Sequence, residues 1–420
     1  MAMTADQLPD DPDALKAVVL ARDVENARLI QIIRELQRHR FGRRAETLPE
    51  DQLLLGLEEA ERADPRERIE RAAKRRANLG ALPAHLPLPL YRQAQIYARQ
   101  GINLDRSTLA DWVGRASWHL RPIHARLLAK LKASPKLFAD ETTAPVLDPG
   151  RGKTKTGPLW AYARDDRPWQ GADPPGVAYV DAPDRKAERP IAHLAGFTGI
   201  LQVDGYGGYR VLADKSGVTL VFCWAHVRRR FYELAAASPA PITSEALRRI
   251  AELYRVEDDI RGRSAEQRRA VRQEKSRPIV ADLEPWLREK LGLISQKTKL
   301  AEAIRYTLSR LDGLSRFLDD GRIEIDRNIV ERSIRPIALN RKNALFAGSD
   351  GGPEHRAAVA SLIETCKLNS VEPLGYLADV LTRIVNAHPN SQIDELLPWP
   401  TSRLPNSEPW PENSAYRLTP

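Results

Sequence analysis

Three acidic residues stand in settings that suit metal-dependent chemistry on phosphate esters. Asp140 and Asp204 each end a short apolar run of strand type at a turn signal, and Glu331 lies in a polar, amphipathic helical stretch. Mg²⁺ and other hard cations prefer such carboxylates. Two ions held about 3.5 to 4 Å apart activate an attacking oxygen and stabilise the leaving one. The trio predicts a two-metal site, with ordinary turn and surface acids as the alternative.

The elements that must position these acids follow an α/β pattern. Strands of a mixed sheet are predicted from apolar runs at 136–147, 158–164, 177–181, a run ending at Asp204, and 219–223. The sequence separation between Asp204 and Glu331 is about twice the separation between Asp140 and Asp204. One strand and one helix would not fill so long a segment. Amphipathic stretches fill residues 243–320. They predict a large helical insertion before the helix of Glu331.

The composition favours a polyanionic partner. The chain has 420 residues, with 65 Lys and Arg against 56 Asp and Glu, a net charge of +9, which suits nucleic acid. No run approaches the roughly 18 apolar residues of a membrane span, and the acidic N-terminus is unlike a signal peptide. Cys223 and Cys366 are isolated, which excludes a disulfide framework and a Cys-x-x-Cys zinc site. We expect a cytoplasmic protein with buried, reduced cysteines and no membrane partner.

Residues 1–50 carry a seam of apolar residues typical of a short coiled coil. The seam consists of Leu15, Val19, Leu29, Ile33 and Leu36, with polar Asn26 at a position that commonly sets oligomer state. It predicts a homo-oligomer, with a helix packed on its own domain as the alternative. Residues 51–89 are charged and then proline-rich, which indicates a linker.

Residues 90–130 predict two short helices around a glycine turn. The first ends at Gly101, and the second is capped by Asp105 or Ser107 and carries Trp112 and Val113. Such a pair is typical of helix-turn-helix. With several arginines nearby, DNA binding and plain helical packing are equally open.

Several longer motifs occur in order along the chain. They are 139–142 with 148–157, Asp204-Gly205-Tyr206, Cys223-Trp224-Ala225-His226 with Arg228 and Arg229, Glu331-Arg332 with Arg335-Pro336, 341–343 and 346–350. Together they resemble the transposases of the bacterial insertion sequence 66 family. The resemblance implies a ribonuclease H-like core in which Asp140, Asp204 and Glu331 are catalytic and hold two Mg²⁺ or Mn²⁺ ions. It implies cleavage at the element's ends by water, then attack of the freed 3'-hydroxyl on target DNA.

The same reading divides the remaining chain. Residues 131–242 and 321–370 form the core around the helical insertion, 371–400 a C-terminal helical segment, and 401–420 a disordered tail. DNA contacts are expected from basic residues at the motifs: Arg151, Lys153, Lys155, Arg228, Arg229, Arg335, Arg341 and Lys342. Asn328 and Arg335 lie on the helix face of Glu331. His226 and Asn328 are candidates for supporting the acids, and a core role is the alternative for His226.

One departure from the family pattern concerns zinc. The family carries a cysteine-rich zinc module after its zipper, whereas here residues 82–87 run directly into 88–93, so no zinc is expected and an internal deletion would explain the junction. A regulator or decayed derivative that only binds DNA therefore stays an alternative, as does a metal-dependent nuclease without joining activity. The implied partners are element ends, target DNA and small accessory proteins of the same element, with nucleoid association when DNA is bound.

Overall fold

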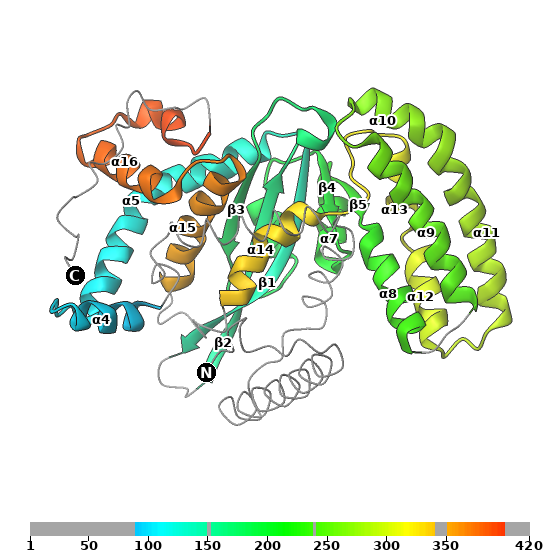
Figure 1. Ribbon diagram of the computed structural model, residues 1–420, viewed down its shortest axis with the longest axis horizontal. Coiled ribbons are helices and arrows are strands. Elements are labelled where there is room, and N and C mark those ends of the chain that lie inside the picture. The colour runs from blue at the N-terminus through cyan, green and yellow to red at the C-terminus, as the bar shows by residue number, and fades with distance from the viewer. Residues whose placement is uncertain (1–88, 149–152, 238–240, 341–350, 400–420) are drawn as a thin grey trace, which may run out of the picture. The chain divides into compact units, whose positions relative to one another are not determined.

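Five strands form one mixed sheet (Figure 1). They are β1 (Lys136–Asp148), β2 (Lys153–Arg164), β3 (Gly176–Asp181), β4 (Ile200–Val203) and β5 (Thr219–Phe222). Their order across the sheet is β3-β2-β1-β4-β5. The pairs β1–β2 and β2–β3 are antiparallel, and the pairs β1–β4 and β4–β5 are parallel. The mixed α/β sheet predicted from the sequence is therefore confirmed.

The computed structural model describes residues 89–148, 153–237, 241–340 and 351–399. The predicted coiled coil at 1–50, the linker as far as residue 88, and the tail at 401–420 lie outside these residues.

β1 is buried on both faces of the sheet, and this decides where its acids point. Leu137 and Ala139 belong to one hydrophobic cluster, whereas Phe138 and Ala144 belong to the other. Because successive strand residues point to opposite faces, residue 140 shares the face of Phe138, and residue 141 shares the face of Ala139.

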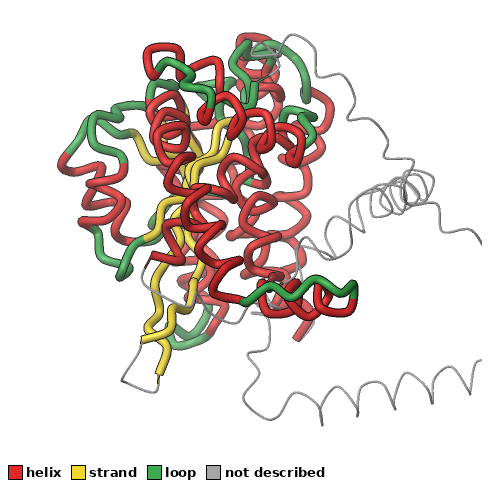
Figure 2. Tube along the Cα trace, turned by 90° about the vertical axis from the view of Figure 1, so that its left-hand side faces the viewer, coloured by secondary structure: helices red, strands yellow, loops and turns green. Residues whose placement is uncertain are grey.

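Two helices, α14 (Asn328–Asn340) and α15 (Gly351–Leu368), cover the face that carries Phe138. Figure 2 shows helices on both sides of the sheet. Ile329, Val330 and Ile334 of α14 are buried against strand residues of that face. On the edge strand β3, the amides of Val177 and Tyr179 donate to the hydroxyls of Thr365 and Ser361 on α15, at 3.1 and 2.8 Å. These side chains satisfy backbone groups that an edge strand otherwise leaves open.

The larger hydrophobic cluster occupies the opposite face of the sheet. Among the helices that contribute to it are α5 (Arg106–Lys132), α6 (Glu188–His193), α7 (Gly207–Lys215) and α8 (Trp224–Ala237). Leu127 of α5, Tyr209 of α7 and Phe231 of α8 are almost wholly buried in it, with Trp160 of β2 at its centre. Both cysteines are free and buried, as predicted.

The helix pair predicted at 90–130 differs from expectation in its second member. α4 (Leu90–Arg99) is followed by Gly101 with φ +80°, but α5 is a single helix of 27 residues and not a short one. Its second half buries Leu120, Leu127 and other residues at three- and four-residue spacing, so this half belongs to the core. Trp112 and Trp118 in its first half are 54% and 62% exposed. DNA binding by this pair stays a prediction.

A bundle of helices lies between α8 and α14 in sequence, as the spacing of the acids predicts (Figure 1). It contains α9 (Pro241–Ile260), α10 (Ala265–Val271), a π-helical turn (Arg272–Ser276), α11 (Arg277–Leu293), α12 (Lys299–Leu308), α13 (Leu311–Ser315) and a 3₁₀ turn (Arg316–Leu318). Ser264 and Gln267 form the capping box that begins α10. We call residues 241–318 the helical insertion.

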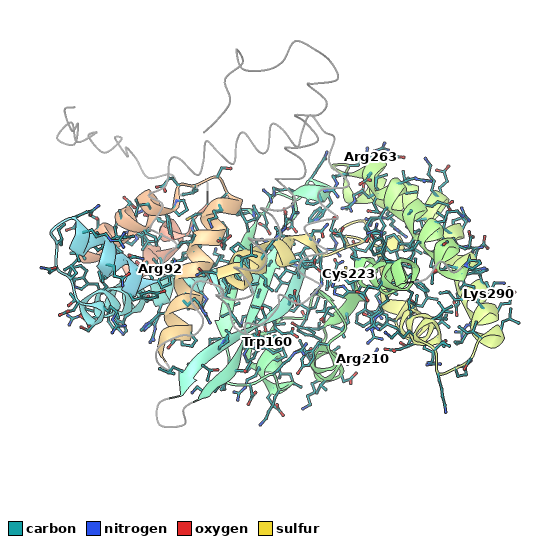
Figure 3. The ribbon with its side chains drawn as sticks, turned by 60° about the horizontal axis from the view of Figure 1, so that its bottom comes forward. Arg92, Trp160, Arg210, Cys223, Arg263 and Lys290 are labelled. Atoms are coloured by element: carbon teal, nitrogen blue, oxygen red, sulfur yellow. The ribbon has the colours of Figure 1, made fainter. Side chains whose placement is uncertain are left out.

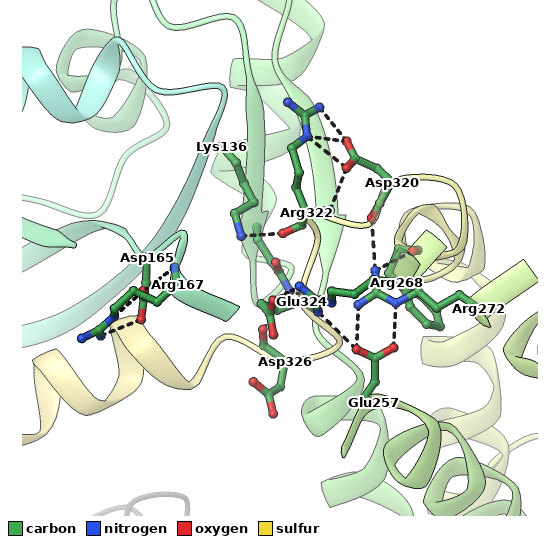
Figure 4. Close-up of polar contacts among 12 residues, drawn as sticks. Lys136, Asp165, Arg167, Glu257, Arg268, Arg272, Asp320, Arg322, Glu324 and Asp326 are labelled. Atoms are coloured by element: carbon green, nitrogen blue, oxygen red, sulfur yellow. Dashed lines mark hydrogen bonds and ion pairs between the residues drawn. The ribbon is translucent and has the colours of Figure 1, made fainter. Parts of the chain in front are cut away.

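Buried charges connect the helical insertion to the segment that leads into α14 (Figure 4). Glu257 of α9 pairs with Arg272 at 2.6 Å and with Arg268 at 3.3 Å, and Arg268 also pairs with Glu324 at 2.7 Å. On the sheet side, buried Lys136 donates to the carbonyl of Arg322 at 2.7 Å. The start of α14 is therefore held between β1 and the insertion.

The C-terminal part consists of α16 (Pro373–Val385) and a 3₁₀ segment (Asn390–Leu396). Tyr376 donates its hydroxyl proton to the carbonyl of Leu396 at 2.6 Å, which ties the two together. Among the residues that the structure describes, no helix is long and apolar enough to cross a membrane.

Candidate active site

Asp140 lies on β1, and Asp204 directly follows β4, the adjacent parallel strand. Phe138 of β1 pairs with Gln202 of β4, so Asp140 and Asp204 follow that pair at the same end. Asp204 ends β4 at a tight turn, where its Oδ1 accepts a hydrogen bond from the amide of Tyr206 at 2.8 Å. Gly205 has φ +112°, a conformation that favours glycine. The Asp-Gly-Tyr sequence thus fixes the turn that presents the second acid.

Glu331 reaches these acids from above the sheet, since it lies in the first turn of α14. The side chains of Glu331 and Asp140 are 9% and 15% exposed, and both contact the same guanidinium. Burial raises the pKa of Asp140 to about 7, and the charges of Asp204 and Glu331 contribute to that rise. The three acids predicted from the sequence are therefore brought together at one place.

The shared guanidinium belongs to Arg327, which the sequence reasoning missed. Its Nη1 lies 3.2 Å from Oδ1 of Asp140, and its Nε lies 3.2 Å from Oε1 of Glu331. Nη1 also donates to the carbonyl of Ala139 at 3.2 Å. The side chain is 4% exposed. Its position four residues before Glu331, at the start of a helix, was the sequence signal that could have indicated a contact between the two side chains.

Arg327 is a buried cation among acids, so its charge is strongly favoured. The charges of Asp140, Glu331 and Asp204 hold the pKa of Arg327 well above its ordinary value, against the opposing effect of burial. Arg327 therefore serves as the counter-ion of the acidic site in the metal-free chain.

Glu141 is a further acid beside the three predicted ones, and the sequence did not indicate a role for it. It points to the opposite face, where Arg185 donates to Oε1 from Nε at 2.8 Å, and its side chain is 5% exposed. Burial and the charge of Asp204 raise the pKa of Glu141, and Arg185 opposes this. The guanidinium of Arg185 stacks 4.4 Å from the ring of Tyr206. Asp204 thus lies within electrostatic reach of acids on both faces.

His226 and Cys223 lie beside Glu331. Figure 3 shows Cys223 between the sheet and the helical insertion. One ligand-type atom from each of the three residues falls within 4.8 Å of the others. Burial, with the charge of Arg327, lowers the pKa of His226 well below its ordinary value, and its Nε2 lies 3.3 Å from Nη2 of Arg327. A neutral His226 accepts this hydrogen bond. Burial raises the pKa of Cys223 to about 12, so its thiol is protonated.

The other predicted site residues fall into four groups. Asn328 donates to Asp326 at 2.7 Å, which fixes the start of α14. Arg228 and Arg229 follow His226 on α8, and Arg335 lies one turn after Glu331 on α14, all of them half-buried. Lys153 and Lys155 belong to β2, where Lys155 is exposed and lies near Asp181. Arg151, Arg341 and Lys342 lie outside the described residues.

The raised pKa of Asp140 predicts a pH-dependent stability of the metal-free chain. In the folded chain the pKa is about 7, against an ordinary value of 3.8. The unfolded chain loses this proton first as pH rises, so the contribution to the free energy of unfolding falls between about pH 4 and about pH 7 and is constant above. Asp140→Asn should remove that decline, and exposed Asp214→Asn on α7 should not. Urea unfolding in a chelator measures both, and equal slopes in all three proteins would contradict the prediction.

Comparison with known proteins matches most of the sequence. Residues 80–355 match the family described as Transposase IS66 family, and residues 361–399 match the IS66 C-terminal element. Residues 28–88 match a segment described as Transposase C of IS166 homeodomain.

Three relatives come from Sinorhizobium fredii, and each is named an uncharacterized protein. y4qI is 51% identical over 320 residues, which cover 74% of this chain and 59% of that protein. y4jD is 46% identical over 76% of this chain and 65% of its own, and y4hP is 41% identical over 75% and 59%. The chain thus spans about three fifths of the length of these relatives.

The matches confirm the resemblance drawn from the motifs. The first of them includes all three acids and alone covers more than half of the sequence. The chain belongs to the IS66 transposase family.

Proposed function

We propose that this protein is a DNA transposase that cuts the ends of an insertion sequence and joins the freed 3'-hydroxyls to target DNA. Asp140, Asp204 and Glu331 are its catalytic residues, and Mg²⁺ or Mn²⁺ is its cofactor. Because the chain spans about three fifths of its relatives' length, its complete activity is part of the proposal, as are oligomerisation through residues 1–50 and accessory partners.

The convergence of the three acids carries this proposal. They come from two adjacent parallel strands and from the helix above them, and their charges act on one another. The order of three antiparallel strands followed by two parallel ones supports a ribonuclease H-like core. A solvated surface trio would lack both the burial and the mutual effect on the pKa of Asp140.

The donor set fits a hard divalent cation. Three carboxylates would hold it, and Oε2 of Glu331 is buried without a hydrogen-bond partner among the described residues. When bound, two such ions would activate the attacking oxygen and stabilise the leaving one. The residues of the chain fix where the scissile phosphate stands, and in such reactions positioning and electrostatics supply most of the catalysis.

Three arginines would hold the DNA strand in position by binding its phosphates. Arg228, Arg229 and Arg335 lie on the two helices that carry His226 and Glu331, and we assign them to backbone phosphates. In the cutting step water attacks phosphorus, and the 3'-oxygen leaves and takes up a proton. In the joining step that 3'-hydroxyl attacks a target phosphate and loses its proton, and a target 3'-oxygen leaves.

Cleavage and strand transfer on labelled DNA with the parent element's ends test the proposal. The wild-type chain is compared with Asp204→Ala and with Asp214→Ala, an exposed aspartate on α7. We expect joined product from the wild type and from Asp214→Ala and none from Asp204→Ala, each with Mg²⁺ present. Circular dichroism shows whether each variant is folded.

The other outcomes separate the alternative functions. Cut but unjoined DNA that depends on Asp204 would identify a nuclease. Retained DNA binding without cleavage by any of the three proteins would identify a derivative that only binds DNA. Equal cleavage by Asp204→Ala and the wild type would refute the assignment of the acids.

A further inference from the structure

A group of arginines surrounds one tyrosine beside Asp204. The guanidinium carbons of Arg230 and Arg310 lie 4.0 and 3.9 Å from the ring centre of Tyr306. The Tyr306 hydroxyl donates to the backbone carbonyl of Asp204 at 3.0 Å. We call Arg210, Arg230, Tyr306 and Arg310 the arginine-tyrosine cluster. Its members come from α7, α8 and the end of the helical insertion.

The cluster adjoins the turn that presents Asp204. A Cβ atom at Gly205 would lie 2.8 Å from Nε of Arg310, so only glycine lets this guanidinium approach the turn. Nε of Arg310 is buried without a hydrogen-bond partner among the described residues. Arg310 and Tyr306 are both half-buried, whereas Arg210 is exposed. The cluster is thus packed together against the Asp204 turn and is not a set of separate surface side chains.

Positive charge is in excess within the cluster. Arg230 pairs with Glu302 at 3.5 Å. Burial lowers the pKa of Arg310, and the charges of Arg210 and Arg230 lower it further, whereas Tyr306 and Asp204 oppose this. Stacking on the Tyr306 ring offsets part of this repulsion, since a ring face attracts cations. Among the described residues, Glu302 pairs with Arg230 and the charge of Asp204 acts on Arg310, so three guanidiniums face two such acids. An anion from outside the chain would neutralise the remaining positive charge.

The position of the cluster identifies this anion as the backbone of a DNA strand. A strand whose phosphate lies at Asp204 continues past residues that contact Asp204, and the hydroxyl of Tyr306 is one such contact. Guanidiniums recognise phosphate through paired N–H donors. A single free anion would neutralise one charge, whereas a phosphodiester strand supplies one charge per nucleotide.

We propose that the arginine-tyrosine cluster binds consecutive phosphates of the DNA strand that enters the acidic site, and that the helical insertion thereby forms one wall of the DNA path. This proposal rests on the proposed function in taking DNA as the substrate and in placing a phosphate of that DNA at Asp204. It assigns the end of the helical insertion a direct contact with DNA, beyond a role in the spacing of Glu331.

The salt dependence of DNA binding tests the proposal. Binding of the full chain to a labelled duplex is measured at several salt concentrations, without divalent metal so that nothing is cut. The proteins are wild type, Arg310→Gln, Arg230→Gln, their double variant, and Arg263→Gln. Arg263 is an exposed arginine at the α9–α10 corner, and Figure 3 shows it on the opposite side of that view from Arg210.

Each lost phosphate contact reduces the slope of log K against log salt by about 0.9. We expect a reduction of about one in each single variant, about two in the double variant, and none in Arg263→Gln. Thermal unfolding shows whether the variants keep the wild-type fold.

Two results would overturn the proposal. One is an unchanged slope in Arg310→Gln and Arg230→Gln, and the other is an equal reduction in Arg263→Gln, which would show a general effect of charge. The slope is read without cleavage. A chain that binds DNA through the cluster but cuts nothing would therefore support this proposal while the proposed function fails.

Discussion

Replacing Arg327 by asparagine is expected to weaken the metal-free fold and to strengthen Mg²⁺ binding. Arg327 lies between Asp140 and Glu331, 3.2 Å from each, and its side chain is 4% exposed. Removing one partner of a buried ion pair costs about 3 to 5 kcal/mol, because the remaining charge is left without compensation. Here two carboxylates lose the same counter-ion.

A divalent cation between the same carboxylates restores that compensation. The guanidinium and the metal ions compete for Asp140 and Glu331, so the wild type must displace or move Arg327 before metal binds. The variant has no such competitor. Ligand binding raises stability by about 2.7 kcal/mol at a concentration about 100 times Kd, and the variant should therefore gain more from Mg²⁺ than the wild type.

Asparagine suits this position because residue 327 directly precedes α14. Asparagine is a preferred residue at the N-terminal cap of a helix, so the helix start itself should survive. Arg327→Lys is the matched control, since lysine keeps the charge but lacks the planar fork that reaches both carboxylates. We expect it to fall between the wild type and Arg327→Asn.

Thermal unfolding with and without Mg²⁺, together with a calorimetric Mg²⁺ titration, measures both effects. The expected result is a lower Tm for Arg327→Asn in a chelator, a larger Mg²⁺-induced rise in Tm, and a smaller Kd for Mg²⁺. An equal rise in Tm and an equal Kd for both proteins would show that Arg327 does not compete with the metal.

The acids could be predicted from sequence because local patterns place them. Asp204 follows the apolar strand β4 as predicted, and the Gly205 turn after it needs its particular residue. Asp140 lies inside β1 and not at a turn that ends its apolar run, because the strand continues to Asp148. Glu331 lies on a short amphipathic helix whose distance from Asp204 demands an insertion. Period-two and period-3.6 patterns place these residues on strand and helix stretches. The resemblance to the IS66 family is what singles them out as the acids of one site.

Contacts between elements that are distant in the sequence could not be predicted, because they depend on how those elements pack. Arg327 becomes a counter-ion only because α14 packs over β1, and no periodicity encodes that contact. Lys136, Arg268 and Arg272 are fully buried, although charged residues are rarely buried and the sequence offers no sign of their partners. The length of α5 is different, since Leu120, Leu127 and Leu131 have helical spacing. Only Pro122 within the helix obscures that pattern.

A loss of stability of the same size is expected for Glu257→Gln. Glu257 accepts from Nε and Nη2 of Arg272 at 2.7 and 2.6 Å, and from Nη2 of Arg268 at 3.3 Å. The two guanidiniums are 0% and 2% exposed, and Glu257 is 6% exposed. An amide keeps the shape of the carboxylate but removes the charge that compensates both. We expect a cost of about 3 to 5 kcal/mol in the free energy of unfolding.

Glu245→Gln is the matched control on the same helix. Glu245 also pairs with two arginines, Arg248 and Arg249, but its side chain is 32% exposed. Ion pairs at the surface contribute about 0 to 1 kcal/mol because water and salt screen them. Urea unfolding of both variants measures the difference, and equal losses would show that burial of the Glu257 pair is not what matters.

The consequence of Glu257→Gln should extend beyond the helical insertion. Arg268 also holds Glu324 at 2.7 Å, and Gln202 of β4 donates to the carbonyls of Glu324 and Asp326 at 2.7 and 3.0 Å. These contacts fix the segment from which α14 begins, and with it Glu331. In a Glu257→Gln protein kept folded at low temperature, Mg²⁺ should therefore bind more weakly, whereas Glu245→Gln should bind it as the wild type does. Unchanged Mg²⁺ binding in Glu257→Gln would separate the stability of the insertion from the geometry of the acids.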